Sequence, residues 1–226
     1  MILIIDKSKK ERTTVSEMFH YMGILSYAVT PQAAFSEIST KYRAILITNP
    51  DSFSDIADYI SRLRRYSANI PIFALSPYPE RKDIPADGTF DYDIYSSTLV
   101  NEVIKYQEER SLPSLGKYLI AGLDLGCDIP TPRYFAEPLK LTKTETMIVR
   151  YLTVAYPSYS SAEEILKHSL KPGKIAEPSV IRAHISSINK KFFLLKGRPL
   201  IISSPGSGYV IATPEILEKQ KHLEYV

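Results

Sequence analysis

Several apolar runs in the first half of the chain end at residues with chemically useful side chains. In a parallel α/β sheet the carboxyl ends of the strands meet at one edge, and such proteins place their chemistry there. The side chains at the ends of these runs include a carboxylate, an ammonium and two aliphatic hydroxyls. We expect them to form a fixed pocket in which the hydroxyl of Thr48 makes hydrogen bonds. The residues at these ends are Asp6, Lys7, Thr48, Ser76 and Tyr95.

A second group of candidate residues lies between Glu177 and Glu215, a span without any acidic residue. Residues 111–226 carry 15 Lys/Arg against 10 Asp/Glu, whereas residues 1–110 carry 13 against 15. A local basic block is typical of a phosphate-binding surface, but surface helices are also basic for solubility, and charge alone leaves both readings open. The cations of this span are Arg182, Lys190, Lys191, Lys196 and Arg198.

Composition excludes several other kinds of site. The 226 residues are 44% hydrophobic and 23% charged, which is typical of a globular protein with one large or two smaller domains. No apolar run reaches the roughly 18 residues of a membrane span and the apolar start is too short for a signal peptide, so we expect a cytoplasmic protein without a membrane partner. The single Cys127 and four scattered histidines predict no disulfide and no metal site. The sequence contains no phosphate-loop, dinucleotide-binding or nucleophile-elbow motif. We therefore expect that the protein is not an enzyme and binds no cofactor.

Strand and helix patterns alternate over residues 1–109. Near-continuous apolar runs separated by amphipathic segments are typical of a parallel sheet covered by helices on both faces. Ser8 and Pro31 mark two helix starts, and the last helix covers 97–109 with Leu99, Val103 and Tyr106 inward. The predicted strands are 2–5, 25–29, 44–48, 71–75 and 90–95.

Two helices of residues 1–109 need separate comment. Asp51 or Ser52 is expected to begin the helix after the third strand, with Asp51 as its cap. Between Ser76 and Tyr95, three prolines and a glycine leave no uninterrupted apolar period, so a helix expected there is shortened to a turn or lost. The interrupting residues are Pro77, Pro79, Pro85 and Gly88.

After a linker at 110–117 the pattern changes to short strands, three helices and a final strand–turn–strand segment. Strands on both sides of a helical run indicate a second, α+β domain over 118–214, followed by a C-terminal tail (215–226) expected to be helical. Two capping boxes, beginning at Thr142 and Ser161, open the first two helices. Gly206 and Gly208 permit a tight turn in the hairpin 200–211.

The third helix of this half, 179–192, has two distinct faces. An apolar stripe recurs at helical spacing along one of them, at Ile181, Ile185, Ile188 and Phe192. The other face combines hydrogen-bonding groups with positive charge, a combination suited to a DNA major groove. Its residues are Val180, Arg182, Ser186, Ser187, Asn189 and Lys190.

Four segments resemble, in order and spacing, the winged helix-turn-helix domain of OmpR/PhoB-type response regulators. They are LTKTETMIVRYL, SSAEEIL, AHISSINKKF and GSGYVI, and the match covers residues 118–212. The resemblance implies that 179–192 is the recognition helix, that 200–211 is the wing, and that loop 170–178 contacts RNA polymerase, although a plain surface loop is equally open. Pro205 stands where the family usually has a wing arginine. The implied DNA-binding residues are Arg182, His184, Ser186, Ser187, Asn189, Lys190, Arg198 and Ser207, with His184 also open as a packing residue.

The first half is similar to the family's receiver domain, an α/β doubly wound, flavodoxin-like fold. By this resemblance Asp6 keeps an acidic position, Lys7 replaces its acidic partner and Thr48 replaces the nucleophilic aspartate. Ser76 is retained, whereas Tyr95 replaces the lysine. A threonine hydroxyl cannot form an acyl phosphate, and an ammonium at Lys7 stands where Mg²⁺ would need a carboxylate, so the resemblance implies a degenerate phosphorylation pocket.

These observations predict a sequence-specific transcription regulator that binds double-stranded DNA without aspartyl phosphorylation. Its receiver would form a homodimer or bind a partner, with Leu99, Val103 and Tyr106 or their neighbours at the interface. The alternative is a protein-interaction module whose winged helix no longer reads DNA. Modification of Thr48, Ser76 or another hydroxyl by a Ser/Thr kinase, and a small ligand in the altered pocket, also remain open at this point.

Overall fold

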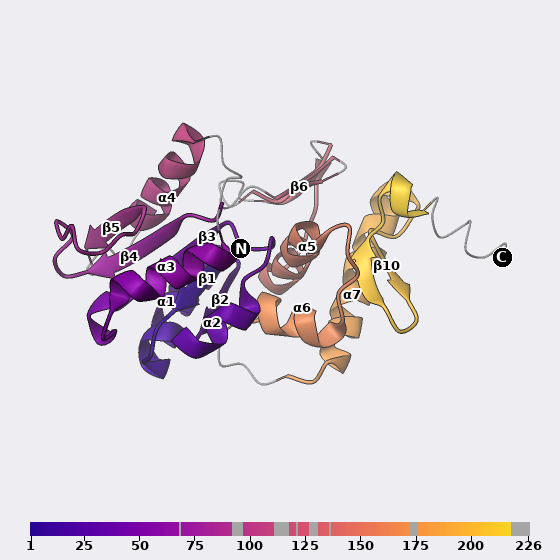
Figure 1. Cartoon of the computed structure of the whole chain (residues 1–226). Helices are drawn as coiled ribbons and strands as arrows, with labels where there is room; N and C mark the ends of the chain where they lie inside the picture. Colours follow the sequence, from indigo (N-terminus) through magenta and orange to yellow (C-terminus); the bar gives the residue numbers. More distant parts are fainter. Residues whose placement is uncertain are drawn as a thin grey trace. The chain divides into compact units, whose positions relative to one another are not determined.

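The computed structural model describes the chain as two compact units, Met1–Gly116 and Lys117–Val226 (Figure 1). The residues described are 1–67, 69–91, 97–110, 118–120, 122–126, 131–135, 137–171 and 176–217. Within these ranges, no helix has the length and apolar character needed to cross a bilayer. Most of the predicted linker, 111–117, and the end of the predicted helical tail, 218–226, lie outside the described residues.

Unit 1 is built on a five-stranded parallel sheet with the order β2-β1-β3-β4-β5. Side chains of β1, β3 and β4 are buried throughout, which is why these strands are apolar without alternation. A central first strand with crossovers to both sides is the flavodoxin-like doubly wound topology, so the predicted fold class is confirmed. The strands are β1 Ile2–Ile5, β2 Ser26–Val29, β3 Ala44–Ile47, β4 Ile72–Ser76 and β5 Gly88–Asp91.

Four α-helices accompany this sheet: α1 Lys9–Tyr21, α2 Pro31–Glu37, α3 Ile56–Tyr66 and α4 Ser97–Glu109. The predicted cap Ser8 accepts a hydrogen bond from the Glu11 amide, and Pro31 begins α2. The prediction that Asp51 caps the next helix is wrong. A 3-10 turn, η1 Pro50–Ser52, intervenes, and Asp55 caps α3 by accepting a hydrogen bond from the Asp58 amide at 2.8 Å.

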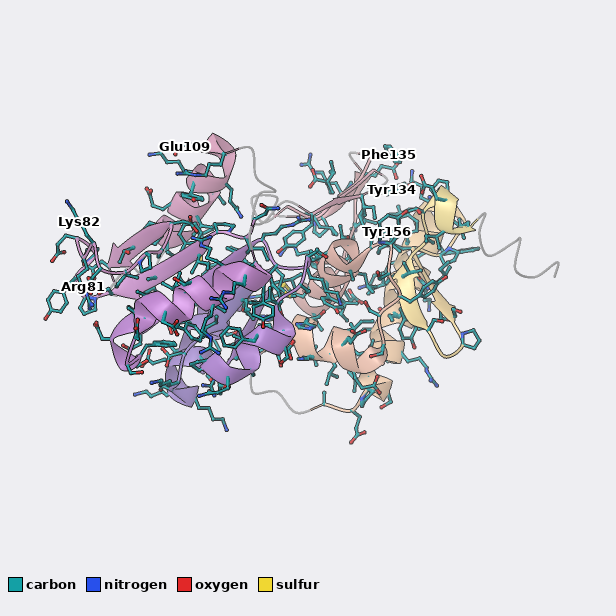
Figure 2. All side chains as sticks on the ribbon, viewed as in Figure 1. Arg81, Lys82, Glu109, Tyr134, Phe135 and Tyr156 are labelled. Carbon is teal, nitrogen blue, oxygen red and sulfur yellow. The ribbon has the colours of Figure 1, made fainter. Side chains whose placement is uncertain are left out.

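The segment between β4 and β5 contains turns and bends but no helix, which confirms the helix loss predicted from its prolines. Arg81 and Lys82 project from this loop (Figure 2). The Arg81 guanidinium donates to Asp83, with its Nε 2.9 Å from Oδ1, and also forms an ion pair with Asp51 of η1. The loop after β4 is thereby tied to the loop after β3.

Helix α4 packs its apolar side into the core of unit 1. Leu99 and Val103 are fully buried, and the Tyr106 ring lies 5.1 Å from the Phe73 ring of β4. Their inward orientation is confirmed. Because Leu99 and Val103 are core residues of unit 1, they are not available for a dimer interface, and a predicted interface through Tyr106 or exposed neighbours on α4 stays a prediction.

Unit 2 combines a four-stranded antiparallel sheet, three helices and a C-terminal hairpin, the element order of a winged helix-turn-helix domain. Its helices are α5 Lys143–Ala155, α6 Ala162–Ser169 and α7 Ser179–Lys196. Both predicted capping boxes are present at the starts of α5 and α6. The strands are β6 Leu119–Ile120, β7 Leu123–Asp124, β8 Arg133–Tyr134, β9 Glu137–Pro138, β10 Ile201–Ser204 and β11 Gly208–Ile211.

Helix α7 is held to α5 by its apolar stripe and by a buried polar cluster. All four stripe residues, Ile181 to Phe192, are buried. Beside them the Glu145 carboxylate accepts hydrogen bonds from Ser187 Oγ at 2.7 Å and Lys191 Nζ at 2.6 Å. Helix α7 continues four residues beyond its predicted end, to Lys196, and stops at Gly197 in a left-handed conformation (φ 66°).

Candidate functional site

The carboxyl ends of β1, β3 and β4 form a closed polar cluster. Thr48 Oγ1 donates to Asp6 Oδ2 at 2.5 Å, and the Ser8 amide donates to the other carboxylate oxygen at 2.5 Å. Ser76 Oγ accepts a hydrogen bond from the Tyr78 amide at 3.1 Å. The relative exposure of Asp6 is 1%, and Thr48 and Ser76 have none. The sequence-based expectation that Thr48 hydrogen-bonds within a fixed pocket is therefore met.

The Lys7 ammonium lies beside the loop after β3. It contacts the carbonyl of Ser52 and lies 5.3 Å from the centre of the Phe53 ring. Close by, Arg12 Nη1 donates to the backbone carbonyls of Asp6, at 2.6 Å, and Lys7, at 3.0 Å. That Lys7 replaces an acidic metal ligand stays a prediction, and Tyr95 lies outside the described residues.

This burial also decides one alternative left open by the sequence. A protein kinase must reach the hydroxyl that it modifies, and the side chains of Thr48 and Ser76 have no solvent exposure. Modification of either residue would require local opening of unit 1. The folded chain therefore does not favour the Ser/Thr kinase alternative at these two hydroxyls.

Helix α7 presents one uncommitted polar stripe. Arg182, Ser186 and Lys190 are exposed and recur at intervals of four residues, which aligns them along one side of the helix. None of the three forms a hydrogen bond or ion pair with another described residue. They therefore retain their full hydrogen-bonding capacity for an external ligand, and two of them carry a positive charge.

Two other predicted DNA-binding residues are engaged inside unit 2. Ser187 is bonded to Glu145. The Asn189 side chain donates to the Ile201 carbonyl at 2.7 Å and accepts from the amides of Leu200, at 3.1 Å, and Ile201, at 2.9 Å. Both are only partly exposed and have side-chain atoms committed to hydrogen bonds within unit 2, so their predicted contact with DNA stays a prediction. Asn189 instead fixes the start of the hairpin on α7.

The remaining cations near α7 are also partly committed. Lys191 and Lys196 pair with Glu145 and Glu137. Arg198 donates from Nη1 to the Ala212 carbonyl at 3.0 Å and from Nη2 to the Tyr134 hydroxyl at 3.1 Å, and it remains partly exposed. His184 is partly exposed as well. Within the described residues, Arg182 and Lys190 are thus the two cations of the acid-free span without a protein partner.

The β10–β11 hairpin ends in an exposed turn at Pro205, Gly206 and Ser207. Close to this turn, the Tyr209 amide donates to the Ser160 carbonyl at 2.8 Å, and the Ser160 amide donates to the Tyr209 carbonyl at 2.9 Å. Gly208 has a φ of 102°, and a Cβ there would lie 2.2 Å from the Ser160 carbonyl oxygen. Only glycine fits this approach, so Gly208 sets the position of the hairpin and Ser207 is displayed at its tip.

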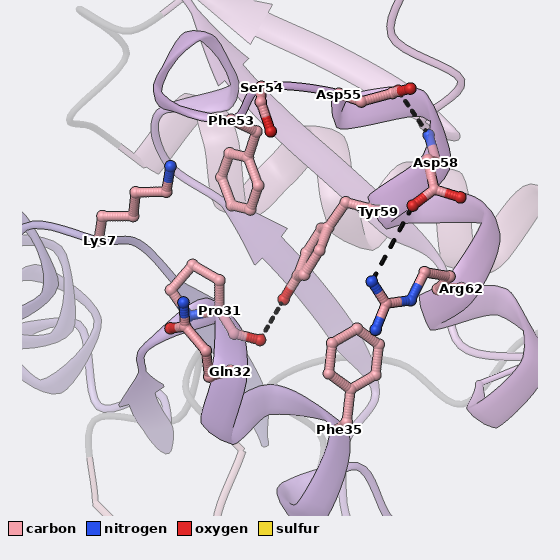
Figure 3. A pocket seen from close by; sticks show the side chains of 10 residues that line it. All are labelled: Lys7, Pro31, Gln32, Phe35, Phe53, Ser54, Asp55, Asp58, Tyr59 and Arg62. Atoms are coloured by element: carbon pink, nitrogen blue, oxygen red, sulfur yellow. Dashed lines mark hydrogen bonds and ion pairs between the residues drawn. The ribbon is translucent and has the colours of Figure 1, made fainter.

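A further cavity escaped the sequence analysis. It has a volume of about 420 Å³ and lies between the loop after β1, the start of α2 and the start of α3 (Figure 3). The signal that could have found it is the grouping of aromatic residues near the ends of strands and the starts of helices. Its lining comprises Lys7, Pro31, Gln32, Phe35, Phe53, Ser54, Asp55, Asp58, Tyr59 and Arg62.

Neither protein-family models nor curated proteins match this chain. Similar solved structures do exist. One, described as belonging to a family of redox sensors in the streptococci that evolved from two-component response regulators, is 18% identical, with a TM-score of 0.39 over 93% of this chain and 98% of that chain. The Thermotoga maritima response regulator DrrB, an OmpR/PhoB homologue, is 19% identical, with a TM-score of 0.41 over 94% of this chain and 98% of its own.

The DNA-binding domain of the response regulator AdeR, solved in complex with an intercistronic region, is 22% identical, with a TM-score of 0.37 over 42% of this chain and 99% of that domain. These values describe a likeness of fold, so the function must be argued from the residues of this chain. Over more than nine-tenths of its length, the chain is similar in fold to solved response regulators of the OmpR/PhoB type and their relatives.

Proposed function

We propose that this chain is a transcription regulator that binds double-stranded DNA through unit 2. The observation that supports this most directly is the stripe Arg182-Ser186-Lys190 on α7, which is exposed, positively charged and free of contacts with other described residues. A helix of this kind fits the major groove, where an arginine can form two hydrogen bonds with a guanine and a lysine can contact a phosphate.

The hairpin supplies a second contact in this proposal. Its turn displays Ser207, and Arg198 at its base keeps part of its guanidinium exposed. Pro205 at the tip donates no hydrogen bond, so we assign the hairpin a backbone-positioning role rather than base recognition. His184, next to the buried stripe, is assigned a packing role with its exposed edge toward the DNA backbone.

We further propose that DNA binding does not depend on aspartyl phosphorylation. The aspartate that would accept a phosphoryl group is replaced by Thr48, and the only acidic residue retained by the motif, Asp6, has both carboxylate oxygens occupied by hydrogen bonds. Asp51, three residues after Thr48, is paired with Arg81. Acetyl phosphate with Mg²⁺ is expected to leave DNA affinity unchanged, and a mass increase of one acid-labile phosphate would contradict this.

The direct test is selection of bound sequences from a random duplex library with the full-length chain. Enrichment of a defined motif is expected. Arg182→Ala should lower the affinity for that motif by about 1–3 kcal/mol and relax the preference at one base pair, whereas Arg182→Lys should retain the salt dependence and lose the base preference. Failure to enrich any motif at low salt would refute sequence-specific binding.

A second candidate, a protein-interaction module, is favoured by a different observation. Several large apolar side chains of unit 2 are exposed, among them Phe135 at 67%, Phe193 at 57% and Leu194 at 80%. Phe135 is labelled in Figure 2. If this function were the main one, Leu194→Ser would abolish regulation while leaving DNA affinity unchanged, and Arg182→Ala would have no effect on it.

A further inference from the structure

The cavity beside Lys7 has the composition of a small-molecule site. Its volume, about 420 Å³, falls within the roughly 300–1,000 Å³ usual for such sites. We propose that it binds a small planar aromatic acid, with the ring against the aromatic side chains and the carboxylate against the Lys7 ammonium. This inference concerns unit 1 alone and does not depend on DNA binding by unit 2.

Three aromatic rings give the cavity its flat, apolar walls. The Tyr59 ring lies 4.6 Å from the Phe53 ring and 5.4 Å, edge-on, from the Phe35 ring. Tyr59 is buried and its hydroxyl donates to the Pro31 carbonyl at 2.8 Å, which fixes its orientation. Phe35 and Phe53 are partly exposed, so they can cover an additional ring in an offset or edge-to-face arrangement.

The charges at the cavity identify which end takes an anion. Figure 3 shows Lys7 and Arg62 on opposite sides of the aromatic rings. Arg62 has a carboxylate nearby, since its Nη1 lies 4.0 Å from Asp58, and its guanidinium also lies 4.9 Å from the centre of the Phe35 ring. The Lys7 ammonium contacts a neutral carbonyl and the Phe53 ring, and no carboxylate pairs with it among the described residues. A bound carboxylate would therefore pair with Lys7.

The acidic residues that line the cavity further restrict the chemical class of ligand that it can bind. Asp55 is partly used as the cap of α3, and Asp58 is paired with Arg62, but both line the cavity and add negative charge. Lys7 and Arg62 balance these two carboxylates, and Lys7 is the one cation of the lining without a carboxylate partner among the described residues, which matches a ligand with a single negative charge. Spare carboxylate oxygens also accept hydrogen bonds, which favours a ring that carries an N–H or O–H donor. The expected ligand class is thus an indole or phenol carrying one carboxylate.

The chain contains no tryptophan, so an indole probe can be excited selectively in its presence. Titration of full-length protein into indole-3-acetate, followed by fluorescence anisotropy, is expected to give saturable binding with a Kd on the order of 0.1–1 mM, as suits a ligand of this size. Indole-3-acetamide should bind at least ten-fold more weakly, and tryptamine should not bind measurably.

Three variants and one control locate the site. Lys7→Met removes the charge but keeps the aliphatic stem, and it should weaken indole-3-acetate binding at least ten-fold, whereas Lys7→Arg should retain it. Phe53→Ala should weaken the acid and the amide alike, because it removes a shared wall. Lys10→Met, an exposed lysine of α1, is the matched control and should bind as wild type. Absence of saturable binding, equal affinity for acid and amide, or an unchanged Kd in Lys7→Met would each overturn the proposal.

Discussion

The hydrogen bond between Thr48 and Asp6 allows a quantitative test of the strand-end cluster. Thr48→Val replaces the hydroxyl by a methyl group of similar size and leaves the buried Asp6 oxygen without its 2.5 Å donor. A buried acceptor that loses its partner costs about 1–3 kcal/mol, with charged acceptors toward the upper end. The added methyl contributes less than about 1 kcal/mol of apolar burial in return. We therefore expect Thr48→Val to lower the free energy of unfolding of unit 1 by about 1–2 kcal/mol.

Unit 1 should be followed separately, because two units need not unfold together. Hydrogen exchange of the β1 and β3 amides reports the opening free energy of this unit. Thr13→Val is the control, since Thr13 Oγ1 bonds only to the Lys9 carbonyl on exposed α1. It should change stability by less than about 0.5 kcal/mol.

A double-mutant cycle separates the hydrogen bond from packing. In an Asp6→Asn background the acceptor is neutral, so removing the Thr48 hydroxyl should cost less than in the wild type. A coupling energy of about 1 kcal/mol is expected. If Thr48→Val is as stable as wild type, or if the coupling is zero, the polar cluster does not hold the strand ends together as described.

Three further predictions concern unit 2. Gly208→Ala should destabilise the hairpin by more than about 2 kcal/mol in urea unfolding, because its Cβ would meet the Ser160 carbonyl, whereas Gly206→Ala, with φ 77° and nothing within 4 Å, should cost about 1 kcal/mol. Burial opposes ionisation of Glu145, but Lys191, the Thr142 amide and Ser187 outweigh it and lower its pKa to about 2. Because the pKa is depressed in the folded state, this stabilisation is present above pH 4.5 and lost toward pH 2, so the wild-type advantage over Glu145→Gln in urea should fall by about 2–3 kcal/mol across that window. Asn189→Ala, which removes three hydrogen bonds to the hairpin start, should increase amide exchange in β10 while leaving the exchange of α5 unchanged.

Much of the fold was predictable because local signals agreed with one another. The apolar runs, the Ser8 and Pro31 helix starts and the two capping boxes each act within a few residues, and all are observed. The loss of a helix before β5 followed from its prolines, whose fixed φ and missing amide act regardless of context. The apolar stripe of α7 likewise made it predictable which side of this helix is buried.

The side-chain roles were less predictable because they depend on neighbours distant in sequence. Several residues between 51 and 55 can cap a helix, and the 3-10 turn that moves the cap to Asp55 has no distinct sequence signature. Asn189 lies on the same polar arc as Lys190, but its partners come from the hairpin that folds back on α7. Lys7 follows Asp6 directly, but its ammonium lies beside Phe53, a residue 46 positions away in the sequence.

The salt dependence of DNA binding by the full chain tests the central claim most directly. We expect log Kd for a selected duplex to rise linearly with log salt concentration, with a slope that decreases by about one unit in Lys190→Ala, which removes the proposed phosphate contact, and with no change on adding acetyl phosphate and Mg²⁺. Lys10→Ala in unit 1 should leave the slope unchanged. Binding whose slope is insensitive to Lys190→Ala, or that appears only after phosphorylation, would contradict the account.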